Sequence, residues 1–339
     1  MAQRKLNRRQ QWRIEKIQQE RQQRLEKKLA QANQAIDPGS LGSEEAGLVI
    51  ANYGASLEIQ DQQGHNHRCL LRQNLPPLVV GDRVIWQRAN EGGVVTAQLP
   101  RDSELARPDA NDKPKAVAAN IDQILVVAAP APEYSTDLID QYLVAAELTG
   151  VSPTLIFNKI DLIDSRNRQA IETILTRYRQ IGYTVLTAST VAEQGLQALR
   201  AQLQHHTSVF VGQSGVGKSS LIRAFIPRDD IAVGPLSQQS GLGQHTTSTS
   251  RLYHLPDGGN LIDSPGVRDF RLWSVSPAKL LEGFRELAPY QGLCKFRDCS
   301  HRHEPGCALR TAVEQGKISA ERLQSYHRLA AQMQEPSWA

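Results

Sequence analysis

The sequence predicts a multidomain α/β protein with a small N-terminal β-barrel, a central α/β domain and a C-terminal helical domain. Three observations predict this fold class. Short strand-like runs separated by turn residues fill residues 46–108. Continuous apolar runs alternate with helical segments over residues 112–272, which is typical of a parallel sheet covered by helices. Residues 273–339 are helical in character apart from a cluster of cysteines and histidines.

Residues 1–45 are interpreted as a basic arm followed by a linker. The first 35 residues hold ten lysines and arginines against three glutamates, a net charge of +7 in a chain whose total is +4. The stretch IDPGSLGSEE at 36–45 is rich in Pro, Gly and Ser, as linkers are. A basic arm on a nearly neutral body indicates a polyanionic partner such as RNA, and a solvated tail is the alternative.

Residues 46–108 contain four strand-like runs at the spacing of a small barrel. An OB-type β-barrel is the preferred interpretation because this fold often binds nucleic acid, although an SH3-like barrel has the same pattern. His65, His67 and Cys69 alternate and would share one face of a strand. The trio lacks a fourth ligand, so ordinary strand residues are favoured over a metal site.

The central domain, residues 112–272, is expected to form one parallel sheet with helices between its strands. Strands are predicted at 121–129, 152–161, 183–190 and 206–211, helices at 137–150 and 165–180, and a hairpin with a further strand within 251–266. A glycine-rich loop and a helix follow the strand at 206–211, which is the local order of a phosphate-binding loop.

The glycine-rich loop matches the phosphate-binding pattern G-x-x-x-x-G-K-[ST]. Glycines let backbone N–H groups turn toward phosphates, and the positive end of the following helix adds to the attraction. Lys218 is expected to reach the β- and γ-phosphates, and the Ser219 hydroxyl to bind Mg²⁺. The residues assigned to the nucleotide here are Gly212, Gln213, Ser214, Gly215, Val216, Gly217, Lys218, Ser219 and Ser220.

A second phosphate element follows the predicted strand NLI at 260–262. Asp263 would hold Mg²⁺ through water, and the Gly266 N–H would reach the γ-phosphate. Asp-Ser-Pro-Gly is also a favourable turn sequence, so this element gains its weight from the phosphate loop beside it.

Asn158, Lys159, Ile160 and Asp161 close a buried strand and resemble the guanine-binding element of the TRAFAC-class GTPases. In that class the aspartate accepts hydrogen bonds from guanine N1 and N2, so the resemblance implies GTP rather than ATP. The next base-contacting element of the class is resembled by Ala188 and Ser189.

The order of these motifs is inverted relative to ordinary G proteins, in which the phosphate loop comes first. Here the guanine element lies at 158–161, the phosphate loop at 212–219 and Asp263 last. The same sheet forms when the original ends are joined and the chain is cut elsewhere. The sequence therefore predicts a circularly permuted P-loop GTPase domain rather than two truncated domains, neither of which would hold GTP.

Val267 occupies the position where Ras-like proteins carry a water-holding glutamine. A polar substitute is expected in the Gly/Ser/Thr-rich stretch 237–250, at the position of switch I. Thr246 or Thr247 can supply the Mg²⁺ and γ-phosphate contact, and Thr247 is taken as the metal ligand. His245 is the catalytic candidate, for orienting water, and a purely local loop contact is its alternative. Slow intrinsic turnover that a partner accelerates is the expected consequence.

Cys294, Cys299, His301 and Cys307 offer three thiolates and one imidazole within 14 residues. This donor set suits one closed, structural Zn²⁺ site with no position left for water. His303 is a competing ligand, and reduced free cysteines are the alternative. Basic residues near the cluster would present positive charge to RNA, and they are Lys295, Arg297, Arg302 and Arg310.

The phosphate loop, the inverted order, Val267, GLGQHTT at 241–247 and CKFRDCSHRHEPGC at 294–307 together resemble one bacterial family, the small ribosomal subunit biogenesis GTPases RsgA, or YjeQ. The resemblance covers essentially the whole chain. It implies an OB fold, a permuted GTPase core and a zinc-binding C-terminal domain. It also implies binding to the small ribosomal subunit and its rRNA, GTP hydrolysis stimulated by that subunit, and a role in late maturation. His245 corresponds to a histidine proposed as catalytic in the family.

The N-terminus lacks a signal-peptide pattern, and no apolar run reaches the roughly 18 residues that span a membrane. A cytoplasmic protein without membrane contact is therefore expected. No oligomerisation seam is evident in the sequence, which favours a monomer.

Two other classes of function stay open beside the GTPase that acts as a switch. One is a GTP-binding RNA scaffold with negligible turnover, an alternative that Val267 supports. The other is a translation or signalling GTPase that acts on protein partners. The basic arm, the barrel and the cysteine cluster disfavour it.

Overall fold

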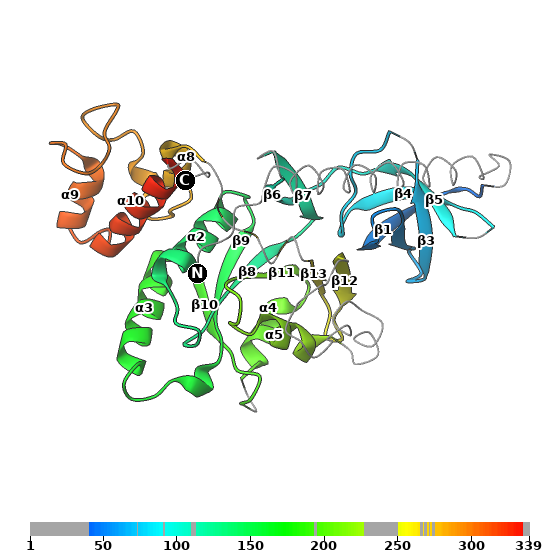
Figure 1. The fold of residues 1–339 in the computed structure, drawn as a ribbon, viewed down its shortest axis with the longest axis horizontal. Helices are drawn as coiled ribbons and strands as arrows, with labels where there is room; N and C mark the ends of the chain where they lie inside the picture. The colour runs from blue at the N-terminus through cyan, green and yellow to red at the C-terminus, as the bar shows by residue number, and fades with distance from the viewer. Residues whose placement is uncertain are drawn as a thin grey trace, which may run out of the picture. The chain divides into compact units, whose positions relative to one another are not determined.

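The computed structural model describes residues 41–72, 74–90, 92–109, 113–192, 195–226, 250–264 and 275–334, together with Val267, Phe270 and Leu272. The chain forms two compact units, one up to Pro100 and one from Arg101 onward (Figure 1). Each unit is described by itself.

The first unit contains a five-stranded barrel. Its strands are β1 (Glu44–Asn52), β2 (Leu57–Gln60), β3 (Asn66–Leu71), β4 (Arg83–Arg88) and β5 (Gly93–Gln98). β1 pairs with both β2 and β4, and β3 runs parallel to β5, so the strands close on themselves. Val49, Ile59, Trp86 and Val95 fill the interior. This pairing is that of an OB-type barrel, as predicted, and the first strand-like run is split into β1 and β2.

His65, His67 and Cys69 behave as ordinary residues of this barrel. His65 precedes β3 and is exposed, whereas Cys69 is fully buried in the core. Nε2 of His67 is 2.8 Å from a carboxylate oxygen of Asp61, and its ring stacks on Trp86 with centroids 4.6 Å apart. The His67 contact holds the pKa of Asp61 at about 2. Across the described residues, the one group of three or more potential metal ligands lies elsewhere.

The second unit opens with an antiparallel hairpin of β6 (Glu104–Pro108) and β7 (Pro114–Ala119). The sequence assigned residues up to 108 to the barrel, whereas β6 pairs with β7 beyond the end of the first unit at Pro100. The Ser103 hydroxyl donates to the Ile121 carbonyl and accepts from the Ile121 N–H, both at 2.7 Å. These bonds join the hairpin to the central sheet.

The central sheet has its strands in the order β10, β9, β8, β11, β13, β12. Their bounds are β8 (Gln123–Ala128), β9 (Ser152–Phe157), β10 (Thr184–Thr187), β11 (Thr207–Val211), β12 (Ser250–His254) and β13 (Asn260–Asp263). All run parallel except β12. β11, which leads into the phosphate loop, lies between β8 and β13.

Helices pack against both faces of this sheet. They are α2 (Thr136–Glu147), α3 (Arg168–Ile181), α4 (Gln197–Leu203) and α5 (Lys218–Phe225), and the short η2 (Ile160–Leu162) follows β9. Leu125, Val127 and Phe210 share one core cluster with α4 and α5. Val126 points to the opposite face because side chains alternate along a strand, and it lies near Ile139 of α2.

The chain continues into a small helical domain. Its elements are α8 (Pro277–Glu282), η4 (Ala288–Tyr290), α9 (Ala308–Glu314) and α10 (Ala320–Gln334). α10 contacts α2 and α8. The Arg322 side chain is 2% exposed, forms ion pairs with Asp140 of α2 and with Glu286, and lies over the rings of Tyr178 and Phe284. Within the described ranges, no helix combines the length and apolarity needed to span a membrane.

Candidate nucleotide site and metal centre

The phosphate loop joins β11 to α5, and two glycines permit its shape. Gly212 has a φ of +137° and Gly217 a φ of +96°, which are conformations that favour glycine. A Cβ atom on Gly217 would lie 2.4 Å from Nδ2 of Asn158, and one on Gly212 would lie 2.3 Å from the Val127 carbonyl oxygen. Any side chain at either position would therefore displace a neighbouring part of the site.

Lys218 opens α5, and the loop encloses its ammonium group. Nζ donates to the carbonyl oxygens of Gly212 at 2.6 Å and Gln213 at 2.7 Å. The positive charge therefore lies at the loop, beside the N-terminal end of a helix, where a phosphate is stabilised. Ser219 follows in the first turn and is half-buried. This arrangement fits the phosphates of a nucleotide.

The guanine element and the phosphate loop are bonded to each other. Asn158 is 2% exposed and donates from Nδ2 to the carbonyl oxygen of Val216 at 2.9 Å. Lys159 donates from Nζ to the carbonyl oxygens of Gly215 and Ala131, each at 2.7 Å. Segments far apart in the sequence therefore form one site. Sequence reasoning missed Ala131, because a backbone carbonyl leaves no signal in residue type.

The Asp161 carboxylate is positioned by the loop after β10. The Ser189 hydroxyl donates to Oδ1 of Asp161 at 2.5 Å, and the N–H groups of Val191 and Ala192 donate to the Ser189 hydroxyl. Ser189 and Ala188 are buried, while Asp161 is exposed. A carboxylate offers only acceptors, so it matches the two donors at guanine N1 and N2 and opposes the acceptor that adenine presents.

Asp263 ends β13, next to the strand that leads into the phosphate loop, and it is 3% exposed. Just after it, the hydroxyls of Ser264 and Ser250 lie 2.7 Å apart and join the end of β13 to β12. Val267 is 1% exposed, and its N–H donates to the Ser264 carbonyl at 3.1 Å. A buried aliphatic side chain cannot hold a water molecule, so this position does not replace the usual glutamine.

Four residues assigned to the nucleotide site lie outside the described residues. They are His245, Thr246, Thr247 and Gly266. Water positioning by His245 and the γ-phosphate and metal contacts of the other three therefore stay predictions.

Cys294, Cys299, His301 and Cys307 converge, with one ligand atom of each lying within 4.8 Å of the others. Sγ of Cys294 is 3.4 Å from Nδ1 of His301 and 4.0 Å from Sγ of Cys307. Zinc bonds of about 2.3 Å to sulfur and about 2.0 Å to nitrogen give a tetrahedron with edges of about 3.5–3.8 Å, so the cluster fits this ion. His303 is exposed and lies outside the cluster, so His301 is the histidine beside the thiols.

Glu304 shapes the loop that carries these ligands. Its carboxylate accepts hydrogen bonds from the N–H and hydroxyl of Ser300 at 2.8 and 2.6 Å, and from the N–H groups of Arg302 and His303 at 3.0 Å. The same bonds hold the pKa of Glu304 well below its ordinary value. They close a tight turn around His301, whose φ is +63°. Sequence reasoning missed this role, for which the signal was an acidic residue inside a tight turn.

Burial favours the uncharged forms of the ligands. It raises the pKa of the Cys299 thiol to about 12 and lowers the pKa of His301. Neutral imidazole is the form that coordinates a metal, whereas a thiol must lose its proton, which the charge of a bound cation favours. The donor set therefore suits a soft or borderline divalent cation.

Comparisons with known proteins find relatives that are about 50% identical to this chain and cover its whole length. The family model described as RsgA GTPase matches residues 98–273. The small ribosomal subunit biogenesis GTPase RsgA of Pseudomonas syringae pv. tomato is 51% identical over 343 residues, with 100% of both chains covered. The RsgA proteins of Ectopseudomonas mendocina and Azotobacter vinelandii are 52% and 50% identical, again with 100% of both chains covered.

Solved structures share the fold. YjeQ from Thermotoga maritima matches with a TM-score of 0.71 at 29% identity, covering 87% of this chain and 100% of that chain. YloQ, described as a circularly permuted GTPase, matches with a TM-score of 0.69 at 28% identity, covering 90% and 100%. The predicted multidomain α/β fold is confirmed. Since its relatives are identical at half or more of their positions from end to end, the chain belongs to the RsgA GTPase family and is a GTP hydrolase.

Proposed function

We propose that this GTPase binds the small ribosomal subunit through its rRNA, assists late maturation of the subunit, and hydrolyses GTP faster when bound to it. The observation that carries the proposal is 51% identity over the whole chain to a relative named for small ribosomal subunit biogenesis. The basic arm supports an RNA partner, because its net charge of +7 would displace counterions from a phosphate backbone.

GTP with one Mg²⁺ is the proposed ligand of the nucleotide site. Lys218 and the loop N–H groups would hold the β- and γ-phosphates, and Asp161 would accept the guanine donors. Ser219, Thr247 and Asp263 are the proposed Mg²⁺ residues. Bound Mg²⁺ supplies neutralisation of the phosphate charge.

His245 is the proposed residue for orienting water, and the buried, aliphatic Val267 supports a substitute of this kind. Turnover of the free protein would be slow. Contact with the subunit would raise the rate by fixing the switch residues in their productive positions.

Zn²⁺ is the proposed occupant of the three-cysteine, one-histidine cluster. Its role would be structural, because four protein ligands leave no position for water. The protein is proposed to be a monomer, since one chain supplies both clusters of residues. A cytoplasmic location follows from the proposed partner, because bacterial ribosomal subunits are assembled there.

The proposal is tested by GTP turnover with and without purified small ribosomal subunits. The wild-type protein, His245→Ala and His254→Ala would be compared. His254 is a matched control because it is an exposed histidine on β12 that bonds to Asn260. Stimulation is expected in the wild type and in His254→Ala, and its loss in His245→Ala.

The other outcomes separate the alternatives. Unchanged stimulation in His245→Ala would keep the subunit-gated GTPase and remove the role of this histidine. Tight GTP binding without stimulation would favour the RNA scaffold with negligible turnover.

A further inference from the structure

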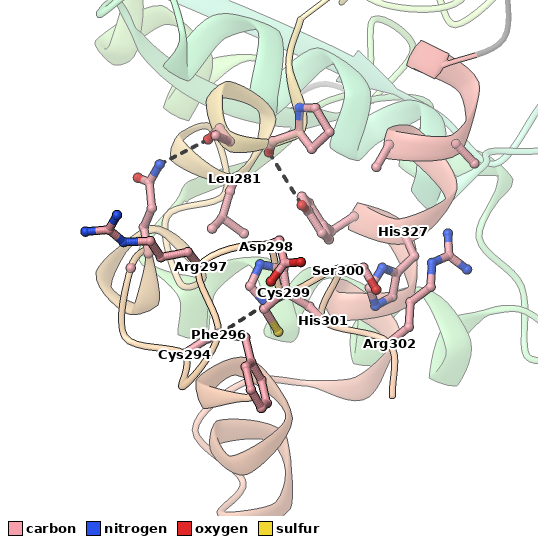
Figure 2. A pocket seen from close by; sticks show the side chains of 17 residues that line it. Leu281, Cys294, Phe296, Arg297, Asp298, Cys299, Ser300, His301, Arg302 and His327 are labelled. Carbon is pink, nitrogen blue, oxygen red and sulfur yellow. Dashed lines mark hydrogen bonds between the residues drawn. The ribbon is translucent and has the colours of Figure 1, made fainter. Parts of the chain in front are cut away.

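A cavity of about 650 Å³ lies beside the metal cluster in the C-terminal domain (Figure 2). It is bounded by the start of α8, the loop that carries the metal ligands, and the face of α10 around Tyr326 and Ala330. The Tyr326 hydroxyl donates to the Pro277 carbonyl at 3.4 Å and joins α10 to α8. Binding sites for small molecules occupy about 300–1,000 Å³, so the cavity can hold a ligand the size of one nucleotide.

Part of the cavity wall is apolar and aromatic. Phe296 is 42% exposed, and Leu281 and Ala330 also line the cavity. The Lys295 ammonium lies 5.5 Å from the centroid of the Phe296 ring. An exposed aromatic ring with a cation near it is a surface on which nucleobases of single-stranded RNA stack.

The rim of the cavity is positively charged. Figure 2 shows Arg297 on one side and Arg302 with His327 on the other. In the ranges that the structure describes, neither guanidinium forms an ion pair with a carboxylate. Asp298 also lines the cavity, whereas Glu304 is occupied by the backbone of its own loop. Two guanidinium groups against one carboxylate favour an anionic ligand.

We propose that this cavity binds one unpaired nucleotide of ribosomal RNA, with the base against Phe296 and the adjoining phosphates on Arg297 and Arg302. The inference rests on the proposed function, which supplies the RNA. A splayed-out base has a free face to stack, whereas a base inside a duplex does not. Because Cys294 and Cys299 line the same cavity, a bound metal ion would also fix the loop that forms its wall.

The first test measures binding of the full-length protein to a short, labelled oligoadenylate by fluorescence anisotropy. Phe296→Leu keeps an apolar side chain but removes the stacking ring, and it is expected to weaken binding by about tenfold. Phe296→Tyr should bind like the wild type. Leu293→Ala is the matched control, because Leu293 is 65% exposed on the same loop and does not line the cavity. Raised salt suppresses the contribution of the basic arm and leaves that of stacking.

The two arginines are tested by the salt dependence of the same affinity. Arg297→Ala and Arg302→Ala should each reduce the slope of log affinity against log salt by about 0.7, the value for one contact to a single-stranded phosphate. Arg179→Ala, at an exposed position of α3 and outside the cavity, should leave the slope unchanged. An equal loss in all three variants would mean diffuse charge and would overturn the inference. Preference for an acidic peptide over the RNA would overturn it as well.

A second experiment separates this inference from the proposed function. Binding of wild type and Phe296→Leu to purified small ribosomal subunits would be compared, with the zinc content of each confirming an intact loop. Failure of the wild type to bind subunits would reject the proposed function. Normal binding and stimulation of the wild type, with identical affinity for Phe296→Leu, would reject the cavity inference alone.

Discussion

Asp161 is the residue on which guanine recognition is expected to depend. Asp161→Asn replaces one acceptor with a donor that would face a guanine donor. The lost hydrogen bond to a charged group costs about 1.5–3 kcal/mol, so the affinity for GDP should fall by about tenfold to a hundredfold. Titration with a fluorescent GDP analogue measures this. Asp164→Asn is the control, because Asp164 is held by Arg166 on the same loop, and an equal loss there would assign the effect to the loop.

The substitution Val267→Gln tests whether a glutamine at this position restores the mechanism of Ras-like proteins. Since the side chain is 1% exposed, Val267→Gln would bury an amide without a designed partner. The free energy of unfolding should fall by about 1–3 kcal/mol, and intrinsic GTP turnover should not rise. Urea unfolding and a phosphate-release assay measure the two quantities. Faster turnover at unchanged stability would show that this side chain reaches the nucleotide.

The site residues that could be predicted from the sequence are those for which the expected ligand requires one particular type of side chain. Lys218, Asn158 and the metal ligands carry side chains that a phosphate loop, a guanine element or a metal requires at a fixed spacing. Ala131 contributes only a carbonyl oxygen, and Arg322 pairs with Asp140, which lies more than a hundred residues earlier in the chain. Roles of this kind depend on tertiary contacts and leave no local pattern.

At the scale of elements, α10 is held to α2 by two Arg–Asp pairs that differ in burial. Arg322 and Asp140 are each 2% exposed, whereas Arg328 and Asp137 are 46% and 32% exposed. Arg322→Met would leave Asp140 and Glu286 buried without their cation, which should cost about 3–5 kcal/mol. Arg328→Met removes a surface pair and should cost at most about 1 kcal/mol. Thermal and urea unfolding measure the loss of stability in the two variants. An equal loss in both would contradict the larger contribution expected of the buried ion pairs of Arg322.

The elements also show where sequence patterns suffice. β8, β9 and β11 were predicted because continuous apolar runs are typical of strands covered on both faces. Residues up to 108 were assigned to the barrel, but its predicted strand-like runs end at residue 100, and no strand was predicted where β6 forms. β6 pairs with β7, which follows after a short connection. The pairing of these two strands depends on their register, which residue type alone does not reveal.

At the scale of the whole molecule, the chain carries two centres of different chemistry. The nucleotide site lies where β9, β11 and β13 end, and the metal cluster lies in the helical domain that α10 anchors to α2. They share no residue. Loss of the metal should therefore affect the proposed subunit interaction far more than nucleotide binding.

Replacement of Cys299, a proposed metal ligand, tests this separation. Cys299→Ser should abolish stoichiometric zinc, because a structural site needs all four ligands to supply its folding free energy. The affinity for GDP should stay within about twofold, as expected for distant and independent sites. Stimulation of turnover by small subunits should be lost. Cys69→Ala, a buried cysteine of the barrel, is the control and should retain one zinc ion per chain. Parallel loss of GDP binding in Cys299→Ser would show that the two centres are coupled.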